Sequence, residues 1–146
     1  MGRWLVFLAL SGCLSFSGPY NAPVVAATDL GDNYAVMVCS WNNLPLIKVW
    51  PQVLASNDVE ILLAHERQHS DDAYAYRGGC WPWMYRFQKD TVFQKRAQLR
   101  AYCTQGRAAI ERNRNPEQVW SYIKAVMLEV YGDTLTKFQN CLYEER

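Results

Sequence analysis

Residues 61–69 read Ile61-Leu62-Leu63-Ala64-His65-Glu66-Arg67-Gln68-His69, and this stretch carries most of what the chain reveals about its fold and chemistry. On an α-helix, His65 and His69 project from one face a single turn apart, so their imidazoles can converge on one Zn²⁺ ion. Glu66 flanks that face, where its carboxylate can act as a general base. The stretch therefore predicts a helix that presents two zinc ligands and a base to one site.

The helix that holds this motif is predicted to span about residues 57–77. Asn57 can cap its first turn, and Glu60, three residues later, completes a capping box. Residues 78–83 read Gly-Gly-Cys-Trp-Pro-Trp, which is rich in turn-forming residues and predicts a loop that ends the helix near Arg77.

A β-hairpin is expected before this helix and two further helices after it. Residues 34–41 and 44–51 read as strands, and the Asn-Asn pair between them forms turns readily. Residues 89–112 read as a second helix, and a third is expected over about 116–142, where the initial Pro suits a first helical turn. The expected fold class is α+β and mainly helical, a short N-terminal hairpin followed by three helices.

Length and composition describe one ordinary globular domain. The chain has 146 residues, of which 50% are hydrophobic and 20% charged, and it contains no internal repeat. Its 15 Lys and Arg residues against 14 Asp and Glu give a formal net charge of +1. A balance this even gives no indication of a nucleic-acid partner. A single domain over residues 28–146 is therefore expected.

The first 27 residues read as a targeting segment. A basic residue precedes a short apolar run, residues 4–16, which is too short to cross a bilayer as a helix. Small residues suited to signal-peptide cleavage occur at Ala22 and at Ala27, whereas Leu10-Ser11-Gly12-Cys13 resembles the lipobox of bacterial lipoproteins. Residues 1–27 are therefore expected to be a signal peptide of an exported protein, periplasmic or secreted, and anchored to the membrane if Cys13 is lipidated.

Four cysteines remain once that segment is removed: Cys39, Cys80, Cys103 and Cys141. An even number in a small exported domain is what two disulfides require. Four cysteines allow three pairings, and the sequence does not choose among them. A zinc site made of four thiolates is disfavoured because no two of them are spaced as Cys-x-x-Cys. Two disulfides are therefore expected.

The two histidines do not complete a zinc site, and the chain contains no third histidine. The next ligand must therefore be an oxygen donor. If the helices over 57–77 and 89–112 form an antiparallel hairpin, the residue level with His69 is Gln98. A neutral amide oxygen binds Zn²⁺ more weakly than a carboxylate does, so this ligand lowers the expected affinity.

Glu129 is the alternative third ligand. Folding the last predicted helix back onto the second helix also brings residue 129 level with residue 98. On a helical wheel, Glu129 lies about 120° from the centre of the apolar face of its helix, which predicts exposure to solvent. Gln98 is therefore preferred, and Glu129 stays open.

The motif over residues 65–69 resembles that of the zincin metallopeptidases. Gln98-Leu99-Arg100-Ala101-Tyr102 resembles the Glu-x-x-Ala-Tyr segment of compact gluzincin-like proteins, with Gln in place of Glu. In those proteins the Ala lets the second helix pack closely against the motif helix. Residues 129–133 are similar to the Glu-x-x-x-Asp segment of thermolysin-like gluzincins. The resemblance implies a zincin-like core built from the three expected helices.

These features predict a small, exported, zinc-dependent metallohydrolase that acts on peptides or proteins. The two histidines and Gln98 would hold Zn²⁺, Glu66 would act as general base and later as acid, and an extended peptide would add to the hairpin. The alternative is a zincin-like binding or structural protein of the cell envelope without catalytic activity. Gln98, Arg67 and Asp71 favour it, because each departs from the usual zincin pattern. A purely structural metal site is a weaker alternative.

Overall fold

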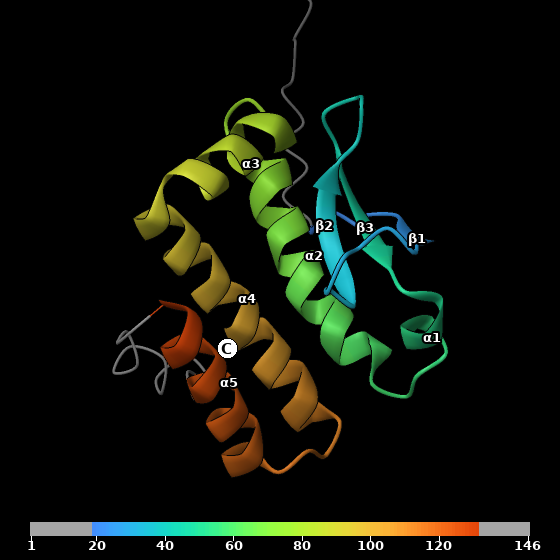
Figure 1. The fold of residues 1–146 in the computed structure, drawn as a ribbon, viewed down its shortest axis with the longest axis vertical. Coiled ribbons are helices and arrows are strands. Elements are labelled where there is room, and N and C mark those ends of the chain that lie inside the picture. Colours follow the sequence, from blue (N-terminus) through green and yellow to red (C-terminus); the bar gives the residue numbers. More distant parts are fainter. Residues whose placement is uncertain (1–18, 132–146) are drawn as a thin grey trace, which may run out of the picture.

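A three-stranded β-sheet covers one side of a group of helices in the computed structural model, which describes residues 19–131 of the chain (Figure 1). The sheet contains β1 (Val24–Ala26), β2 (Ala35–Cys39) and β3 (Pro45–Val49) in the order β1-β3-β2. β2 and β3 form the predicted antiparallel hairpin, and β1 pairs with β3 in parallel. β2 is therefore an edge strand. The prediction of a mainly helical α+β fold is confirmed.

β1 lies in the stretch that the sequence assigned to the signal peptide. Its Val24 pairs with Ile47 of β3, and the ring of Tyr20 just before it stacks on Tyr74 with ring centroids 4.4 Å apart. A cleavage after Ala27 would therefore remove one strand of the sheet. Cys13 and its lipobox lie outside the described residues.

The motif helix is α2 (Val59–Ala75), which follows the short helix α1 (Pro51–Leu54). It begins later than predicted, because Asp58 occupies the N-cap position and its side chain makes no capping hydrogen bond. Glu60 accepts a hydrogen bond from Arg67 (2.8 Å) and does not reach back to the start of the helix. The predicted capping box is therefore wrong, although the helix itself is confirmed.

A helix occupies most of the stretch that was predicted to be a loop. α3 (Cys80–Lys89) begins directly after Gly78 and Gly79, whose φ angles of 95° and 86° suit glycine. A Cβ at Gly79 would lie only 2.5 Å from the Asn43 side chain, so the close approach also requires glycine. The prediction was wrong because Pro82 falls in the first helical turn, where its missing N–H is not needed.

The two later helices are α4 (Thr91–Glu111) and α5 (Pro116–Tyr131). The Asp90 side chain caps α4 by accepting a hydrogen bond from the Phe93 N–H (3.0 Å). The predicted continuation of the last helix to about residue 142 lies outside the described residues. No helix between residues 19 and 131 is both long and apolar enough to cross a membrane.

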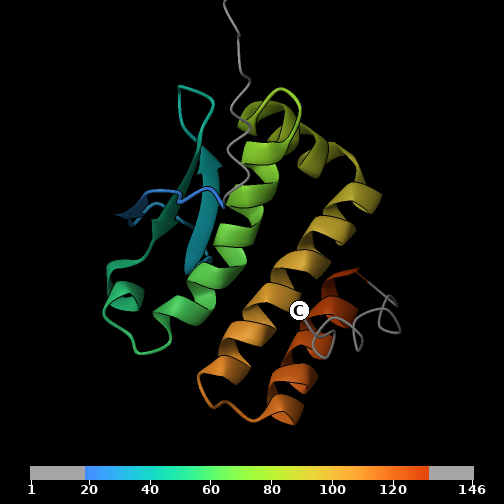
Figure 2. The ribbon, with the colours of Figure 1, turned by 180° about the vertical axis from the view of Figure 1, so that it is seen from behind.

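α2 lies between the sheet and α4, and α5 packs on α4 (Figures 1 and 2). Ala97 and Ala101 of α4 are fully buried, and their short side chains let α4 approach α2 closely. Ile123 and Met127 of α5 are each 1% exposed and pack with Cys103 of α4. These contacts fix the spacing of the helices that carry the candidate site.

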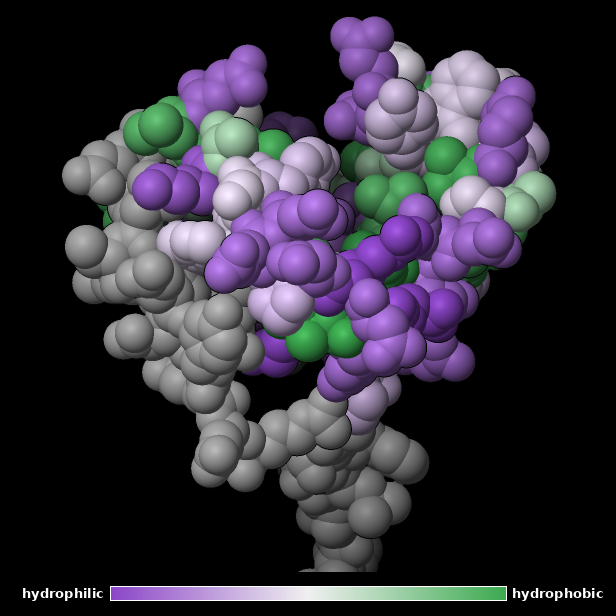
Figure 3. Space-filling view, turned by 90° about the horizontal axis from the view of Figure 1, so that it is seen from below, coloured by the Kyte–Doolittle hydropathy of each residue, from purple (hydrophilic) through white to green (hydrophobic). Residues whose placement is uncertain are grey.

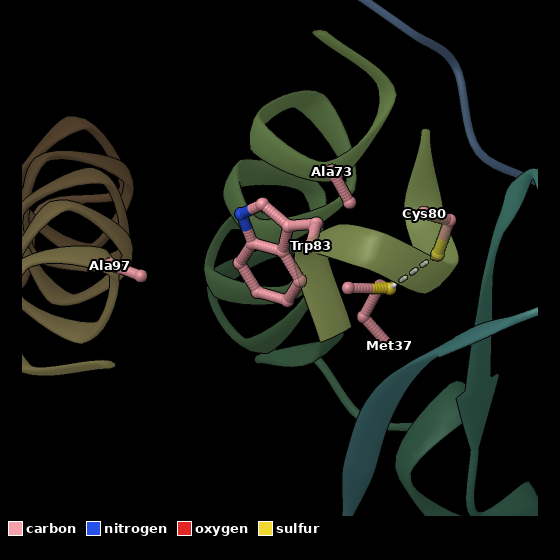
Figure 4. Close-up of a cluster of buried hydrophobic side chains, with 5 residues drawn as sticks. All are labelled: Met37, Ala73, Cys80, Trp83 and Ala97. Carbon is pink, nitrogen blue, oxygen red and sulfur yellow. Dashed lines mark hydrogen bonds between the residues drawn. The ribbon is translucent and has the colours of Figure 1, made fainter. Parts of the chain in front are cut away.

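A buried cluster joins the sheet edge to three helices, and it contains Met37, Ala73, Cys80, Trp83 and Ala97 (Figure 4). The Trp83 ring lies between Ala97 on one side and Ala73 with Met37 on the other. Trp83 is only 2% exposed. Truncating a buried side chain of this size typically destabilises a protein by about 3–5 kcal/mol. The cluster therefore holds β2 at a fixed distance from α2 and α3.

A disulfide between Cys39 and Cys80 ties the end of β2 to the start of α3 (S–S 2.03 Å). The two cysteines are 41 residues apart in sequence, and a loop of this size corresponds to a stabilisation of about 4 kcal/mol in the chain-entropy description. Cys103 is also disulfide-bonded. Cys13 and Cys141 lie outside the described residues. Of the two expected disulfides, the one between Cys39 and Cys80 is thus confirmed.

Candidate active site

Two helices bring three predicted site residues together. The Gln98 Oε1 of α4 lies 3.1 Å from His65 Nε2 and 3.3 Å from His69 Nε2 of α2. The two imidazole rings are themselves 4.9 Å apart, centroid to centroid. The residue that the sequence placed level with His69 therefore meets both histidines.

His65 also contacts a second amide, on a residue that the sequence did not identify. Its Nδ1 lies 3.0 Å from Gln105 Oε1. Because an amide oxygen only accepts hydrogen bonds, neutral His65 can donate to Gln105 through Nδ1–H or to Gln98 through Nε2–H, but not to both at once. Gln105 follows Gln98 by seven residues, two turns along the same face of α4. This spacing from Gln98 is the sequence feature that could have identified Gln105.

His69 is positioned by aromatic packing. Its ring lies 5.6 Å from the Trp83 ring and 5.5 Å from the Phe87 ring, centroid to centroid, and the Phe87 contact is edge-on. Its Nδ1 is buried and has no hydrogen-bond partner among the described residues. The His69 ring therefore makes its polar contact through Nε2, with Gln98.

Burial keeps both imidazoles neutral at physiological pH. It lowers the pKa of His65 to about 4, although the hydrogen bonds with Gln105 and Gln98 act in the opposite direction. Burial lowers the pKa of His69 to about 3, and the neighbouring His65 lowers it further. Neutral imidazole is the form that binds metal ions.

Glu66 faces the sheet edge beside this group. Its Oε2 accepts a hydrogen bond from the Met37 N–H of β2 (2.7 Å). Burial raises the pKa of its carboxyl to about 7, and the hydrogen bond from Met37 opposes this shift. A carboxyl with this pKa can both accept and release a proton near neutral pH.

A cleft of about 670 Å³ opens beside the three converging side chains. Figure 3 shows the molecule hollowed between the side that carries the sheet and the side that carries α4 and α5. β2 lines the cleft along its whole length, and the other walls include His65, Glu66, His69, Met84, Phe87, Gln98, Tyr102 and Gln105. The candidate ligands and the candidate base thus share one cavity with the edge strand β2, whose Met37 N–H is bonded to Glu66.

The donor set fits Zn²⁺. Bonds of about 2.0–2.1 Å to a tetrahedral zinc ion place its ligand atoms roughly 3.3 Å apart, close to the two distances from Gln98 Oε1. In the tautomer that carries its proton on Nδ1, His65 Nε2 faces the amide oxygen acceptor to acceptor, and a cation between them would satisfy both atoms. Among residues 19–131, no group of three His, Cys, Asp or Glu side chains could hold a metal ion. The third donor here is an amide.

The alternative third ligand, Glu129, lies outside the cleft. Glu129 is exposed on α5 and does not line the cleft, which agrees with the exposure predicted from its helical wheel. Asp133 lies outside the described residues. Arg67, one of the departures from the usual motif, pairs with Glu60 (2.8 Å) and also does not line the cleft.

Comparisons of the chain with models of protein families, with curated proteins and with solved structures find no match. The geometry of the cleft therefore carries the functional proposal. Its central features are the two neutral histidines, the amide oxygen between them and the carboxyl at the strand edge.

Replacing Gln105 with Leu is expected to weaken zinc binding by about 10- to 100-fold. The substitution removes the acceptor for the His65 Nδ1 proton and so frees both the tautomer and the ring orientation. Competition with a chromophoric chelator measures the affinity, and circular dichroism verifies the fold. Gln105→Glu, which retains an acceptor oxygen, should restore most of the affinity. Equal affinity in wild type and Gln105→Leu would show that Gln105 does not position His65.

The metal-free protein is expected to become less stable as the pH falls below about 6.5. From there down to about pH 4, the unfolded chain binds protons on both imidazoles, whereas the folded chain does not. Each proton that only the unfolded chain binds lowers the free energy of unfolding by about 1.4 kcal/mol for every pH unit of the fall. Glu66 acts oppositely, because its raised pKa stabilises the folded chain at low pH and this contribution is lost as the pH rises through about 7.

Denaturant unfolding in the presence of chelator, repeated across this pH range, measures the effect. His69→Gln should reduce the slope of the unfolding free energy against pH by about 1.4 kcal/mol per pH unit relative to wild type. The reason is that one of the two neutral imidazoles is gone. Parallel stability profiles for the two proteins would contradict the assignment of His69 as a buried neutral imidazole.

Proposed function

We propose that this protein is a small zinc-dependent hydrolase of peptide bonds. The observation that carries the proposal is the placement of His65, His69 and Gln98 around one point, with Glu66 beside them in the same cleft. The disulfide at Cys39 supports an exported location, because such bonds persist in oxidising compartments. The zincin-like character of the helical core belongs to the same proposal.

His65, His69 and Gln98 are the residues that would hold the metal ion. When bound, Zn²⁺ would polarise the substrate carbonyl and lower the pKa of water. Glu66 takes a proton from the attacking water and later delivers it to the leaving amine nitrogen. Burial raises the pKa of this carboxyl in the metal-free protein. The Met37 N–H holds the carboxyl at the sheet edge, where a substrate on that edge would lie next to it.

β2 offers the substrate the edge of the sheet, on which the Met37 N–H already donates to Glu66. The Ser40 N–H donates to the Leu44 carbonyl across the hairpin (2.9 Å), so the even-numbered residues of β2 bond to β3. The odd-numbered residues Ala35 and Met37 turn their backbone groups away from β3, toward the side where Glu66 lies. An extended peptide can pair with such an edge by strand addition.

The proposal is tested by incubating the zinc-loaded, oxidised protein with a mixture of unstructured peptides and following cleavage by mass spectrometry. Cleavage should stop when a chelator is added and return when zinc is supplied in excess over the chelator. Metal content measured on the same samples should follow the activity. Cleavage that persists undiminished in metal-free protein, or its absence in protein that contains zinc, would contradict the proposal.

The amide donor of Gln98 favours a second function, which is peptide binding without hydrolysis. A neutral ligand set stabilises Zn²⁺ less than a set with a carboxylate, and a site without metal would retain both the cleft and the strand edge. In that case peptide binding should be unaffected by chelator and by His65→Ala. Loss of binding in the variant would exclude this second function.

A further inference from the structure

We infer that one end of the molecule binds the surface of an anionic lipid bilayer. This end is formed by the turn between β2 and β3, residues 40–44, together with the exposed face of α3, and it lies at the top of Figure 1. We call it the aromatic end, and its exposed side chains are those of Trp41, Trp81 and Tyr85, with Arg77 and Lys89. None of these residues is a proposed metal ligand or the proposed base, so the inference does not depend on zinc.

Hydrogen bonds hold the turn against the start of α3. Asn43 donates from its side chain to the Gly78 carbonyl (2.7 Å) and accepts from the Trp81 N–H (2.8 Å). The indole N–H of Trp81 donates to the Ser40 carbonyl (3.1 Å). The backbone of Trp41, which follows Ser40, is therefore held next to Trp81, and the aromatic end is one connected surface.

The aromatic side chains of this end are turned to solvent. Trp41 is 93% exposed, Tyr85 67% and Trp81 52%. Trp81, Tyr85 and Lys89 follow one another at intervals of four residues, so they share one face of α3. Another face of the same helix packs Trp83 into the core cluster. Exposed apolar side chains that gather in one place mark a site of interaction with a protein or a membrane.

The charges of the aromatic end favour an anionic membrane. Neither the turn nor α3 contains an acidic residue, and their charged side chains, with Arg77 just before α3, are all basic. Arg86 pairs with Asp90 (3.3 Å), whereas Arg77 and Lys89 are exposed and form no ion pair within residues 19–131. Lysine and arginine are attracted to anionic headgroups, and each contributes about 1 kcal/mol near such a surface.

Tryptophan and tyrosine are suited to the same partner. Their rings are apolar, but each carries an N–H or O–H that can stay hydrated, and both residues are enriched where a bilayer meets water. Aromatic side chains with free cations beside them therefore match the headgroup region of an anionic bilayer in both polarity and charge.

The described chain begins near this end. The Tyr20 ring stacks on Tyr74 in the last turn of α2, and the Tyr20 hydroxyl donates to the carbonyl of Pro45, where β3 begins after the turn (3.3 Å). The residues before Pro19 include the apolar stretch 4–16, which the sequence predicts to be part of a targeting segment. A membrane that meets this stretch would therefore lie near the aromatic end.

Binding to vesicles tests the inference on the purified, oxidised full chain. Vesicles that contain equal amounts of phosphatidylcholine and phosphatidylglycerol are compared with vesicles of phosphatidylcholine alone, and bound protein is measured by co-sedimentation. Wild type should bind the anionic vesicles on the order of 10-fold more tightly, and this preference should shrink as salt is added. Equal binding to both kinds of vesicle, or no binding to either, would overturn the inference.

Variants at exposed residues locate the binding surface, with circular dichroism to establish that each is folded. Trp41→Ser and Tyr85→Ser should each weaken binding to the anionic vesicles by about 10-fold, because less apolar surface leaves water. Lys89→Gln should weaken it by about fivefold. Tyr122→Ser, the matched change at a residue of α5 that is 58% exposed, should bind as wild type does.

All these proteins share the same N-terminal residues, so a difference between them reports on the substituted surface. Unchanged binding in both Trp41→Ser and Tyr85→Ser would remove the aromatic end from the membrane contact and overturn the inference. Sedimentation of the protein without vesicles gives its oligomeric state. A wild-type dimer that Trp41→Ser converts to a monomer, with no binding to vesicles, would assign the surface to a second copy of the chain instead.

Discussion

Glu66→Gln is expected to lower the rate of peptide hydrolysis by about 10²- to 10⁴-fold while zinc remains bound. The amide cannot take a proton from water, but its oxygen can still accept the hydrogen bond from the Met37 N–H, so β2 and α2 stay joined. Because the buried carboxyl has a raised pKa, its replacement should leave stability unchanged or raise it above pH 7. Steady-state cleavage of a fluorogenic peptide, with metal analysis of the same sample, measures both effects.

Glu60→Gln is the matched control. It makes the same chemical change on the same helix, at a residue whose carboxylate pairs with Arg67 and does not line the cleft. Its activity should stay close to that of wild type. If Glu66→Gln retains activity within about twofold of wild type, Glu66 is not the base.

Gln98→Glu is expected to raise the affinity for zinc by on the order of 10- to 100-fold. A carboxylate replaces a neutral amide oxygen that lies 3.1–3.3 Å from both histidines, and so adds a full negative charge next to the cation. In chelator the same variant should be less stable than wild type, because the new carboxyl is partly buried beside two neutral rings. The sign of the stability change should therefore reverse when zinc is added.

Thermal unfolding with and without zinc measures this reversal. Gln118→Glu, an identical change on the exposed face of α5, should show no dependence on zinc. If Gln98→Glu is destabilised equally in both conditions, Gln98 is not a metal ligand.

The features that the sequence predicted well depend on regular local geometry. The spacing of His65 and His69 guarantees a shared face on any helix. Gln98 could be placed because two antiparallel helices advance by the same rise per residue, provided that the connection joins helix ends that are level with each other. The connection turned out to contain α3, and Gln98 still meets His69.

The features that the sequence did not predict depend on contacts between distant segments. β1 pairs with β3 in parallel, and such pairing leaves no signal as local as a hairpin turn. Pro82 was interpreted as a breaker although it falls in the first turn of a helix. Gln105 gains its role only through the His65 ring, 40 residues earlier in the chain. Glu66 is at a predicted position, but its partner, Met37, became known only from the packing of β2 on α2.

The most direct test of the central claim is the zinc content of purified, oxidised wild-type protein beside His65→Ala, determined by elemental analysis after both have been supplied with zinc. We predict one zinc ion per chain in wild type and its loss in the variant, with circular dichroism to establish that the variant is folded. Zinc well below one equivalent in both proteins, or an equal content in both, would contradict the assignment of His65, His69 and Gln98 as a metal site.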